Sequence, residues 1–192
     1  MRLRIGERSN FIFLLFLYFV LSLALSPANA QHLDQKEPLD LEKVFKEGLK
    51  RGGKYLDLKG KKIGDVGLKK LGQQEWLKKV TKIELRYNDL TEEGAKILSQ
   101  FPLLPNLKVL ILRHNFLSDP GAVTLSKNSN FPNLTEMQLG WNEIRDAGAV
   151  AFAESKAFPK LQNLDLRGNF LSDQTKEELK KTLAHLKSLQ LY

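Results

Sequence analysis

The sequence contains no cysteine, which excludes a disulfide-stapled scaffold and a cysteine nucleophile. Its three histidines, His32, His114 and His185, do not have the spacing of a metal site. Neither a G-x-S-x-G motif nor a phosphate-binding glycine loop occurs. Because the usual catalytic patterns are missing, we expect a protein without enzymatic activity, metal or cofactor.

The sequence has a single long hydrophobic run, which lies near the N-terminus. Three arginines precede an uncharged apolar run over residues 11–26, and Ala28-Asn29-Ala30 has the small-x-small form of a signal peptidase site. These 16 residues are fewer than the ~20 that a membrane-spanning helix usually needs. We therefore predict a signal peptide over residues 1–30 and export to the periplasm or the extracellular space. The alternative is an uncleaved segment that anchors the protein to a membrane.

The net charge of +8 is unevenly distributed along the chain. Residues 42–82 carry 13 basic and five acidic side chains, whereas residues 83–192 carry 13 of each. Such a basic flank favours an anionic membrane surface, an envelope polyanion or an acidic protein, although exposed lysines also simply keep proteins soluble. No nucleic-acid partner is expected. The residues of this predicted basic flank are Lys50, Arg51, Lys54, Lys61, Lys62, Lys69, Lys70, Lys78 and Lys79.

A strict period of 27 residues dominates the rest of the chain. It relates Lys61, Asn88, Asn115, Asn142 and Asn169. Each asparagine follows a frame of spaced aliphatic residues, seen most plainly as L-x-x-L-x-L-x-x-N-x-L over residues 107–117. The L-x-L part predicts a short strand with one buried face, and apolar residues three apart after each turn predict a helix. Strand, turn and helix, repeated five times, predict a solenoid in which the asparagines are structural.

Local signals predict where each helix begins and ends. An acidic residue two positions before a glycine marks each start, and Thr91 and Ser118 are the predicted N-cap residues. Three apolar-proline pairs are expected to end helices: Leu104-Pro105, Phe131-Pro132 and Phe158-Pro159.

The two ends of the repeat array have their own patterns. Residues 38–50 place Leu41, Val44, Phe45 and Leu49 on one helical face, which predicts a capping helix within an N-terminal segment of residues 31–52. At the other end, residues 186–191 begin a sixth frame and stop. We expect the last strand to present an open edge, and edges of this kind favour a homodimer.

The frames, together with the acid-x-Gly-Ala helix starts at residues 92–95, 119–122 and 146–149, resemble the leucine-rich repeat family and its ribonuclease-inhibitor-like subclass. The resemblance covers residues 53–192. It implies an α/β solenoid of five full repeats and a partial sixth, with short parallel strands on the concave face and helices on the convex face. It also implies a role in binding proteins or peptides. The subclass includes activators of small GTPases, but that role requires the cytosol and the export signal argues against it.

The variable strand positions suggest where a partner would bind. In repeats one, two and five an acid and a base lie two residues apart (Asp57/Lys59, Glu84/Arg86 and Asp165/Arg167), and we expect these pairs to be solvated. Repeats three and four break this pattern, and three aromatic-type side chains align in one column across repeats two to four. The predicted contact residues are Tyr87, Ile111, Arg113, His114, Gln138 and Trp141, with Arg86 at the margin. Alternatively, Tyr87 and Trp141 cover the edge of the core.

The expected size of the concave face limits the kind of partner. Six strands ~4.8 Å apart, with ~5 residues each at ~3.3 Å, give ~400 Å². A standard interface buries ~800 Å² on each partner. The estimate favours a peptide, a weakly bound protein or self-association over a large globular partner.

Overall fold

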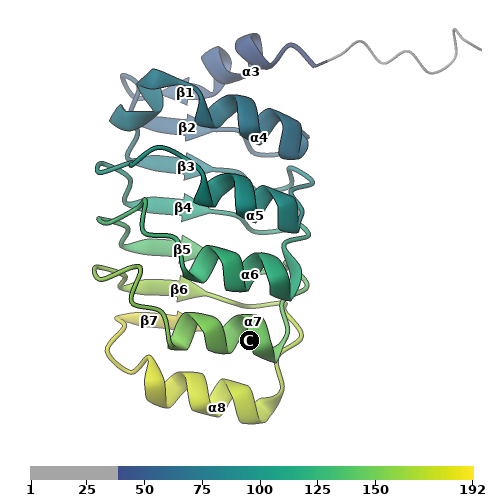
Figure 1. Cartoon of the computed structure of the whole chain (residues 1–192), viewed down its shortest axis with the longest axis vertical. Coiled ribbons are helices and arrows are strands. Elements are labelled where there is room, and N and C mark those ends of the chain that lie inside the picture. The colour runs from purple at the N-terminus through teal and green to yellow at the C-terminus, as the bar shows by residue number, and fades with distance from the viewer. Residues whose placement is uncertain (1–38) are drawn as a thin grey trace, which may run out of the picture. The chain divides into compact units, whose positions relative to one another are not determined.

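The computed structural model describes residues 39–192, which form one unit. The predicted signal peptide and the first part of the predicted capping segment lie outside the described residues. Within them, seven strands form one sheet in chain order, and the helices that link the strands stack beside it (Figure 1). No helix within residues 39–192 is both long and apolar enough to cross a bilayer.

The predicted leucine-rich-repeat solenoid is confirmed, with its strands parallel from β2 to β7. Neighbouring strands pair one repeat apart, as in Leu56 with Ile83 and Ile83 with Leu110. The strands are β1 (Leu49–Lys50), β2 (Tyr55–Asp57), β3 (Lys82–Glu84), β4 (Val109–Ile111), β5 (Glu136–Gln138), β6 (Asn163–Asp165) and β7 (Ser188–Gln190). The helices are α3 (Leu41–Gly48), α4 (Gly64–Gly72), η1 (Glu75–Lys79), α5 (Glu92–Ser99), α6 (Ser118–Ser126), α7 (Asp146–Ala153) and α8 (Asp173–Thr182).

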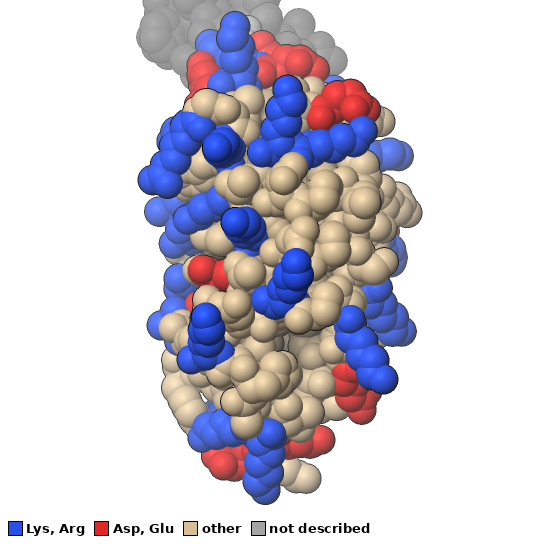
Figure 2. Space-filling view, turned by 90° about the vertical axis from the view of Figure 1, so that its left-hand side faces the viewer, with Lys and Arg blue, Asp and Glu red and all other residues tan. Residues whose placement is uncertain are grey.

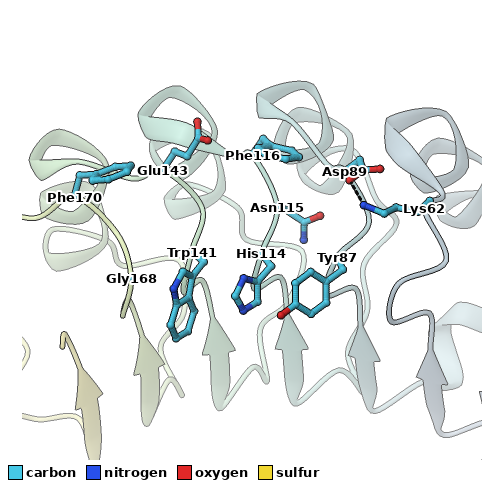
Figure 3. A pocket seen from close by; sticks show the side chains of 10 residues that line it. All are labelled: Lys62, Tyr87, Asp89, His114, Asn115, Phe116, Trp141, Glu143, Gly168 and Phe170. Atoms are coloured by element: carbon cyan, nitrogen blue, oxygen red, sulfur yellow. Dashed lines mark hydrogen bonds and ion pairs between the residues drawn. The ribbon is translucent and has the colours of Figure 1, made fainter.

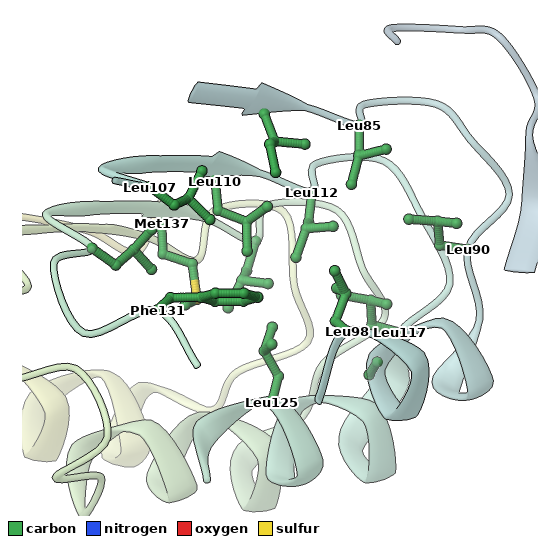
Figure 4. Packing of buried hydrophobic residues seen from close by; sticks show 14 of the residues in the cluster. Leu85, Leu90, Leu98, Leu107, Leu110, Leu112, Leu117, Leu125, Phe131 and Met137 are labelled. Carbon is green, nitrogen blue, oxygen red and sulfur yellow. The ribbon is translucent and has the colours of Figure 1, made fainter. Parts of the chain in front are cut away.

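The core lies between the sheet and the row of helices. Figure 4 shows Leu112 and Met137 pointing from the strand side toward Leu125 of α6, with Phe131 between the layers. All four side chains are fully buried. Burial of a leucine or phenylalanine side chain contributes about 1.5–3 kcal/mol relative to exposure. The constant aliphatic positions of the period therefore account for the stability of the stack.

The capping helix forms, but it ends earlier than predicted. Asp40 caps α3 by accepting a hydrogen bond from the Lys43 backbone N–H (3.1 Å), and Phe45 is buried against the first coil. The chain then leaves the helix, and Leu49 and Lys50 pair antiparallel with β2. At Gly48 an added Cβ would lie 2.7 Å from the carbonyl oxygen of Asp57. The pairing with β2 therefore ends the helix, and local sequence does not show it.

The expectation that prolines end the helices is wrong. Helices α5, α6 and α7 end at Ser99, Ser126 and Ala153, six residues before Pro105, Pro132 and Pro159. Each proline instead follows a buried apolar residue that opens a tight turn, as in the hydrogen bond from Leu107 N–H to the Leu104 carbonyl (3.2 Å). Proline is favoured at the second position of such turns because its φ is already suitable.

The helix starts are capped from the preceding repeat. Carboxylates of Asp65, Asp119 and Asp146 accept backbone N–H bonds from the next helix entry, at Thr91 (3.1 Å), Arg145 (2.7 Å) and Ser172 (2.8 Å) respectively. Each acid therefore stabilises a helix one repeat further along than expected.

Of the two predicted N-caps, Thr91 is confirmed and Ser118 is wrong. The Thr91 hydroxyl accepts from Glu93 N–H (3.2 Å). In the third coil, the acidic residue at the capping position of the preceding repeat is Glu92, whose side chain is one methylene longer than that of aspartate. The Ser118 N–H donates to the Asn142 carbonyl (2.8 Å) instead. Ser118 then adopts φ +52°, a left-handed conformation that costs a non-glycine residue about 1–2 kcal/mol.

This strain predicts that Ser118→Gly raises the free energy of unfolding by up to about 1 kcal/mol, because glycine adopts positive φ without steric cost. Thr91→Gly is the matched control at the same place in the preceding repeat, where φ is −105° and the hydroxyl caps the helix. It is expected to lower stability. Urea denaturation of both variants checks the prediction, and an equal loss in both would contradict it.

Candidate functional site

Three aromatic side chains stack where strands β3, β4 and β5 end. Tyr87, His114 and Trp141 all have left-handed backbones, with φ of 58°, 54° and 55°, so their side chains leave successive coils in the same direction. Neighbouring ring centroids are 4.3 and 4.7 Å apart, with 14° between the planes in each case. Figure 3 shows these three rings in a row just beyond the strand ends. We call this row the aromatic stack.

Glycines occupy the two positions that continue the aromatic stack, Gly60 before it and Gly168 after it. Both have positive φ, +67° and +68°. A Cβ on Gly168 would lie 2.4 Å from the Trp141 indole, whereas a Cβ on Gly60 would have no neighbour within 4 Å. The indole therefore occupies space that only a glycine at position 168 leaves open. The sequence analysis did not predict this role.

Arg113 joins the aromatic stack to the charged face of the sheet. Its guanidinium carbon lies 4.6 Å from the Trp141 ring centre, a cation–π distance. Its Nε lies 3.9 Å from Asp165 Oδ2, an oxygen that also pairs with Arg167 at 2.8 Å. Burial raises the pKa of Asp165, but the hydrogen bonds and charge of Arg167 outweigh it and hold the pKa below its usual value. The ionised carboxylate thus helps to position Arg113 on Trp141.

A second ridge runs beside the aromatic stack, formed by the residue that follows each period-marking position. We call it the outer ridge; its members are Lys62, Asp89, Phe116, Glu143 and Phe170. Lys62 and Asp89 form an ion pair at 2.6 Å. Together the two ridges line a groove of about 340 Å³ (Figure 3). Sequence reasoning missed the outer ridge, although its 27-residue spacing was visible at the x of each N-x-L.

The predicted contact residues do not form one surface. Tyr87, His114 and Trp141 line the groove, and Arg113 contacts Trp141. Gln138 and Arg86 lie outside the groove lining. The Gln138 amide donates to Glu136 (2.6 Å), and Arg86 pairs with Glu84 (2.7 Å).

The expected exposure of Ile111 is wrong, because its side chain is only 3% exposed. Ile111 pairs in register with Glu84 on one side and Gln138 on the other. Side chains directly opposite one another on neighbouring strands are in contact. Ile111 is therefore covered from both sides and is buried even though it lies outside the main core.

The charged pairs of the sheet also differ in part from expectation. Glu84 pairs with Arg86 and Asp165 with Arg167 as predicted, but both carboxylates are buried rather than solvated. Asp57 pairs with Lys50 of β1 at 2.7 Å, and Lys59 offers it only a backbone N–H at 3.3 Å. The antiparallel strand β1, which the sequence did not predict, supplies this different partner.

The imidazole of His114 has a lowered pKa. Desolvation in the aromatic stack is the main cause, and the positive charges of Arg113 and Arg86 add to it. Because the pKa in the fold is below the ordinary value of 6.5, the neutral ring is favoured. The contribution of the neutral His114 ring to the free energy of unfolding is present above pH 6.5 and is lost as the pH falls through the lowered pKa.

We therefore expect the His114 ring signals, followed by NMR, to titrate with a midpoint below 6.5. In the variant Arg113→Gln the midpoint should rise, because one repelling charge is removed. Lys127→Gln, an exposed change elsewhere in the chain, should leave it unchanged. A wild-type midpoint at or above 6.5 would contradict the stacked environment.

The predicted basic flank does not form a single patch. All nine of its residues are exposed, but Lys61 and Lys62 follow a strand, whereas Lys54, Lys78 and Lys79 precede one. Lys50, Lys62 and Lys78 are engaged in ion pairs.

A broader basic face runs along the side where the strands begin (Figure 2). The segments that lead into strands β2 to β7 contain nine basic residues and two acidic ones, a balance of +7. The basic ones are Arg51, Lys54, Lys78, Lys79, Lys108, Lys127, Lys156, Lys160 and Lys187, and the acidic ones are Glu75 and Glu154. The groove lies at the opposite, strand-end side.

The last strand has an open edge, as expected from the sequence. Among residues 39–192, β7 pairs only with β6. Tyr192 then turns back onto α8, where its hydroxyl accepts a hydrogen bond from Lys180 Nζ (3.0 Å). A homodimer across the β7 edge stays a prediction.

Comparison with known proteins supports the leucine-rich repeat family. Residues 77–99, 104–126 and 132–153 match the family model described as Leucine Rich repeat. No curated protein matches the chain. Among the similar solved structures is Leiomodin-1 Actin-Binding Site 2 (ABS2), at 17% identity and a TM-score of 0.49, over 67% of this chain and 77% of that one.

Proposed function

We propose that this leucine-rich-repeat solenoid binds a peptide segment of a protein partner in the groove between the aromatic stack and the outer ridge. One observation carries the proposal. Residues 39–192 contain eight exposed large hydrophobic side chains, and four of them line this groove. They are Tyr87 (40% exposed), Phe116 (51%), Trp141 (38%) and Phe170 (59%). Aromatic residues gathered at one place are typical of the energetic centre of an interface.

The arrangement of the aromatic stack also favours binding. Stacking and the cation–π contact of Arg113 hold the rings in place before a partner arrives, which reduces the entropy lost on association. Tyr87 and Trp141 keep about two fifths of their surface exposed, which favours binding over the alternative in which they cover the edge of the core. A groove of about 340 Å³ accommodates a few residues of a peptide rather than a globular surface.

We place this binding outside the cytosol, in a non-catalytic protein of the ribonuclease-inhibitor-like subclass. The proposal rests on the N-terminal sequence and on the acid-x-Gly-Ala helix starts. Sequencing of the mature N-terminus tests export, because cleavage predicts a chain that begins at Gln31. A full-length chain in the membrane fraction would instead support the anchored form.

Panning of a random peptide library on the purified mature protein tests the groove. Peptides selected by the wild type should lose at least about ten-fold in affinity with Tyr87→Ala or Trp141→Ala, since an interface hot spot contributes about 2 kcal/mol or more. Leu103→Ala is the matched control, because Leu103 is exposed but lies outside the groove lining. If only Leu103→Ala weakened binding, the proposed site would be wrong.

We also propose, as a second candidate function, that the basic face binds an anionic membrane surface. Its support is the balance of nine basic to two acidic residues along the side where the strands begin. Sedimentation with phosphatidylglycerol vesicles should then show salt-sensitive binding. Charge reversal at Lys108 and Lys160 should reduce it, and Tyr87→Ala should leave it intact. Absence of binding at low salt would overturn this second proposal.

A further inference from the structure

We infer that the groove binds a polyproline II segment that carries a basic residue beside its prolines. The inference rests on the proposed function, since it names the chemistry of the peptide that the same groove would take. Three features of the groove carry it: the spacing of its aromatic rings, the hydrogen-bond donors of the aromatic stack and the carboxylate of Glu143.

The spacing of the outer ridge matches the polyproline II helix. Neighbouring coils are about 4.8 Å apart, in line with the 4.3 and 4.7 Å between stacked rings. Phe116 and Phe170 are two coils apart, hence about 9.6 Å along the groove. A polyproline II helix advances about 9.3 Å per turn of three residues. Residues i and i+3 of such a helix therefore meet Phe116 and Phe170 in the same way.

An extended β-strand fits this spacing less well. Its side chains return to the same face every second residue, or about 6.7 Å, so successive side chains would not match rings about 9.6 Å apart. Its backbone would also need a strand edge to pair with. The groove is lined by side chains beyond the strand ends, and the edges of the described sheet are at β1 and β7, elsewhere in the fold.

The aromatic stack offers hydrogen-bond donors that suit a polyproline II backbone. Such a helix has no internal hydrogen bonds, so its carbonyl groups are available to a partner. Trp76 Nε1 donates to Gln74 (3.1 Å), but the Trp141 indole N–H and the Tyr87 hydroxyl have no hydrogen-bond partner among residues 39–192. Both residues line the groove. Their donor groups are available to carbonyl groups of a peptide bound over the aromatic stack.

The charges of the groove favour a basic residue in the ligand. Asp89 is neutralised by Lys62, whereas Glu143, exposed between Phe116 and Phe170, forms no ion pair within residues 39–192. His114 adds no positive charge near neutral pH, because its pKa is lowered by desolvation and by neighbouring arginines. The groove lining thus has a balance of −1 in a chain whose net charge is +8.

The outer ridge already shows how a cation is accommodated. The Arg145 guanidinium lies 5.3 Å from the centre of the Phe170 ring. No cation covers Phe116 among the described residues, and Glu143 is its neighbour along the ridge. A ligand arginine or lysine placed on Phe116 would therefore gain a cation–π contact and an ion pair together.

Isothermal titration calorimetry of the mature protein with synthetic peptides tests the inference. The probe is a peptide of about 12 residues, four polyproline II turns, with prolines at every third position and one flanking arginine. One control peptide has the same composition with its prolines at irregular positions. A second control peptide keeps the regular prolines and has glutamate in place of the arginine. We expect each control to bind at least about ten-fold more weakly, which corresponds to about 1.4 kcal/mol.

Variants of the protein separate the two contributions. Glu143→Gln should lower the affinity for the arginine peptide several-fold. It should leave unchanged the affinity for a peptide in which norleucine replaces the arginine. Phe116→Ala should lower the affinity for both peptides. Glu154→Gln is the matched control, because Glu154 is an exposed carboxylate far from the groove. An equal effect of Glu143→Gln and Glu154→Gln would overturn the charge assignment.

The outcomes distinguish the inference from the proposed function. If the regular and irregular peptides bind equally and both lose affinity with Tyr87→Ala, the polyproline II assignment is wrong and the peptide groove stands. The same holds if only library peptides without proline bind. If no peptide binds the wild type, or if only an oligosaccharide does, the proposed function fails and the inference fails with it.

Discussion

Asn115→Ala is expected to lower the free energy of unfolding by about 3 kcal/mol or more, because four buried backbone groups lose a hydrogen bond and only one of them, the Leu112 carbonyl, keeps another partner in the Asn142 amide. The Asn115 oxygen accepts from the N–H groups of Asn88 (3.0 Å) and Leu90 (3.1 Å). Its amide donates to the carbonyls of Leu85 (3.0 Å) and Leu112 (2.8 Å). These bonds join the second and third coils, so their loss weakens the stack at its middle. Urea denaturation followed by circular dichroism measures the effect.

Asn142→Ala provides the matched control one repeat later. Its amide donates to the carbonyls of Leu112 (2.9 Å) and Leu139 (3.0 Å), but its buried oxygen has no hydrogen-bond partner among residues 39–192. The loss of stability should therefore be smaller than that of Asn115→Ala, since the Leu112 and Leu139 carbonyls keep hydrogen bonds from the Asn115 and Asn169 amides. An equal or larger loss at Asn142 would show that the hydrogen bonds of Asn115 do not decide the stability here.

Gly168→Ala is expected to displace the Trp141 indole and to reduce peptide binding by at least ten-fold, a loss of about 1.4 kcal/mol. The new Cβ would lie 2.4 Å from the indole, well inside van der Waals contact. Because Trp141 stacks on His114 at 4.7 Å, its displacement also alters the wall of the groove. Fluorescence in a Trp76→Phe background, where Trp141 is the remaining tryptophan, reports the change directly.

Gly60→Ala separates the steric effect from the backbone effect. Both glycines have nearly the same positive φ, so both alanine variants should lose about 1–2 kcal/mol of stability. Gly60 has no neighbour within 4 Å of an added Cβ, so Gly60→Ala should keep the fluorescence of Trp141 and the affinity for peptide. If the two variants bind peptide equally, the contact between Gly168 and Trp141 does not shape the groove.

Local patterns were sufficient to predict most of the fold. Leu110, Leu112 and Asn115 recur at one period, and their burial follows from that period alone. The aromatic column was also visible, because Tyr87, His114 and Trp141 occupy one repeat position. Residues at one position of a regular solenoid lie in adjacent coils, so their proximity could be predicted without coordinates.

Contacts between coils account for the failures. Because proline disrupts helices, the sequence favours helix ends at the prolines. The helices end earlier, however, because the chain turns inward to bury residues such as Phe131. The aspartates were assigned to their own helices, but Asp119 and Asp146 reach the next ones. The sequence favours exposure of Ile111, but its neighbours on the adjacent strands bury it.

The 27-residue period alone predicts the repeat length, the strand and helix order, the core positions and the residues of the aromatic column. Packing in the folded chain was needed to show that this column stacks, that Gly168 leaves room for it and that Phe116 and Phe170 form the opposite wall of a groove. A periodic pattern specifies which residues are equivalent, but it does not specify their orientation. Backbone angles such as the positive φ of Tyr87 and Trp141, together with packing between coils, decide where those equivalent side chains point.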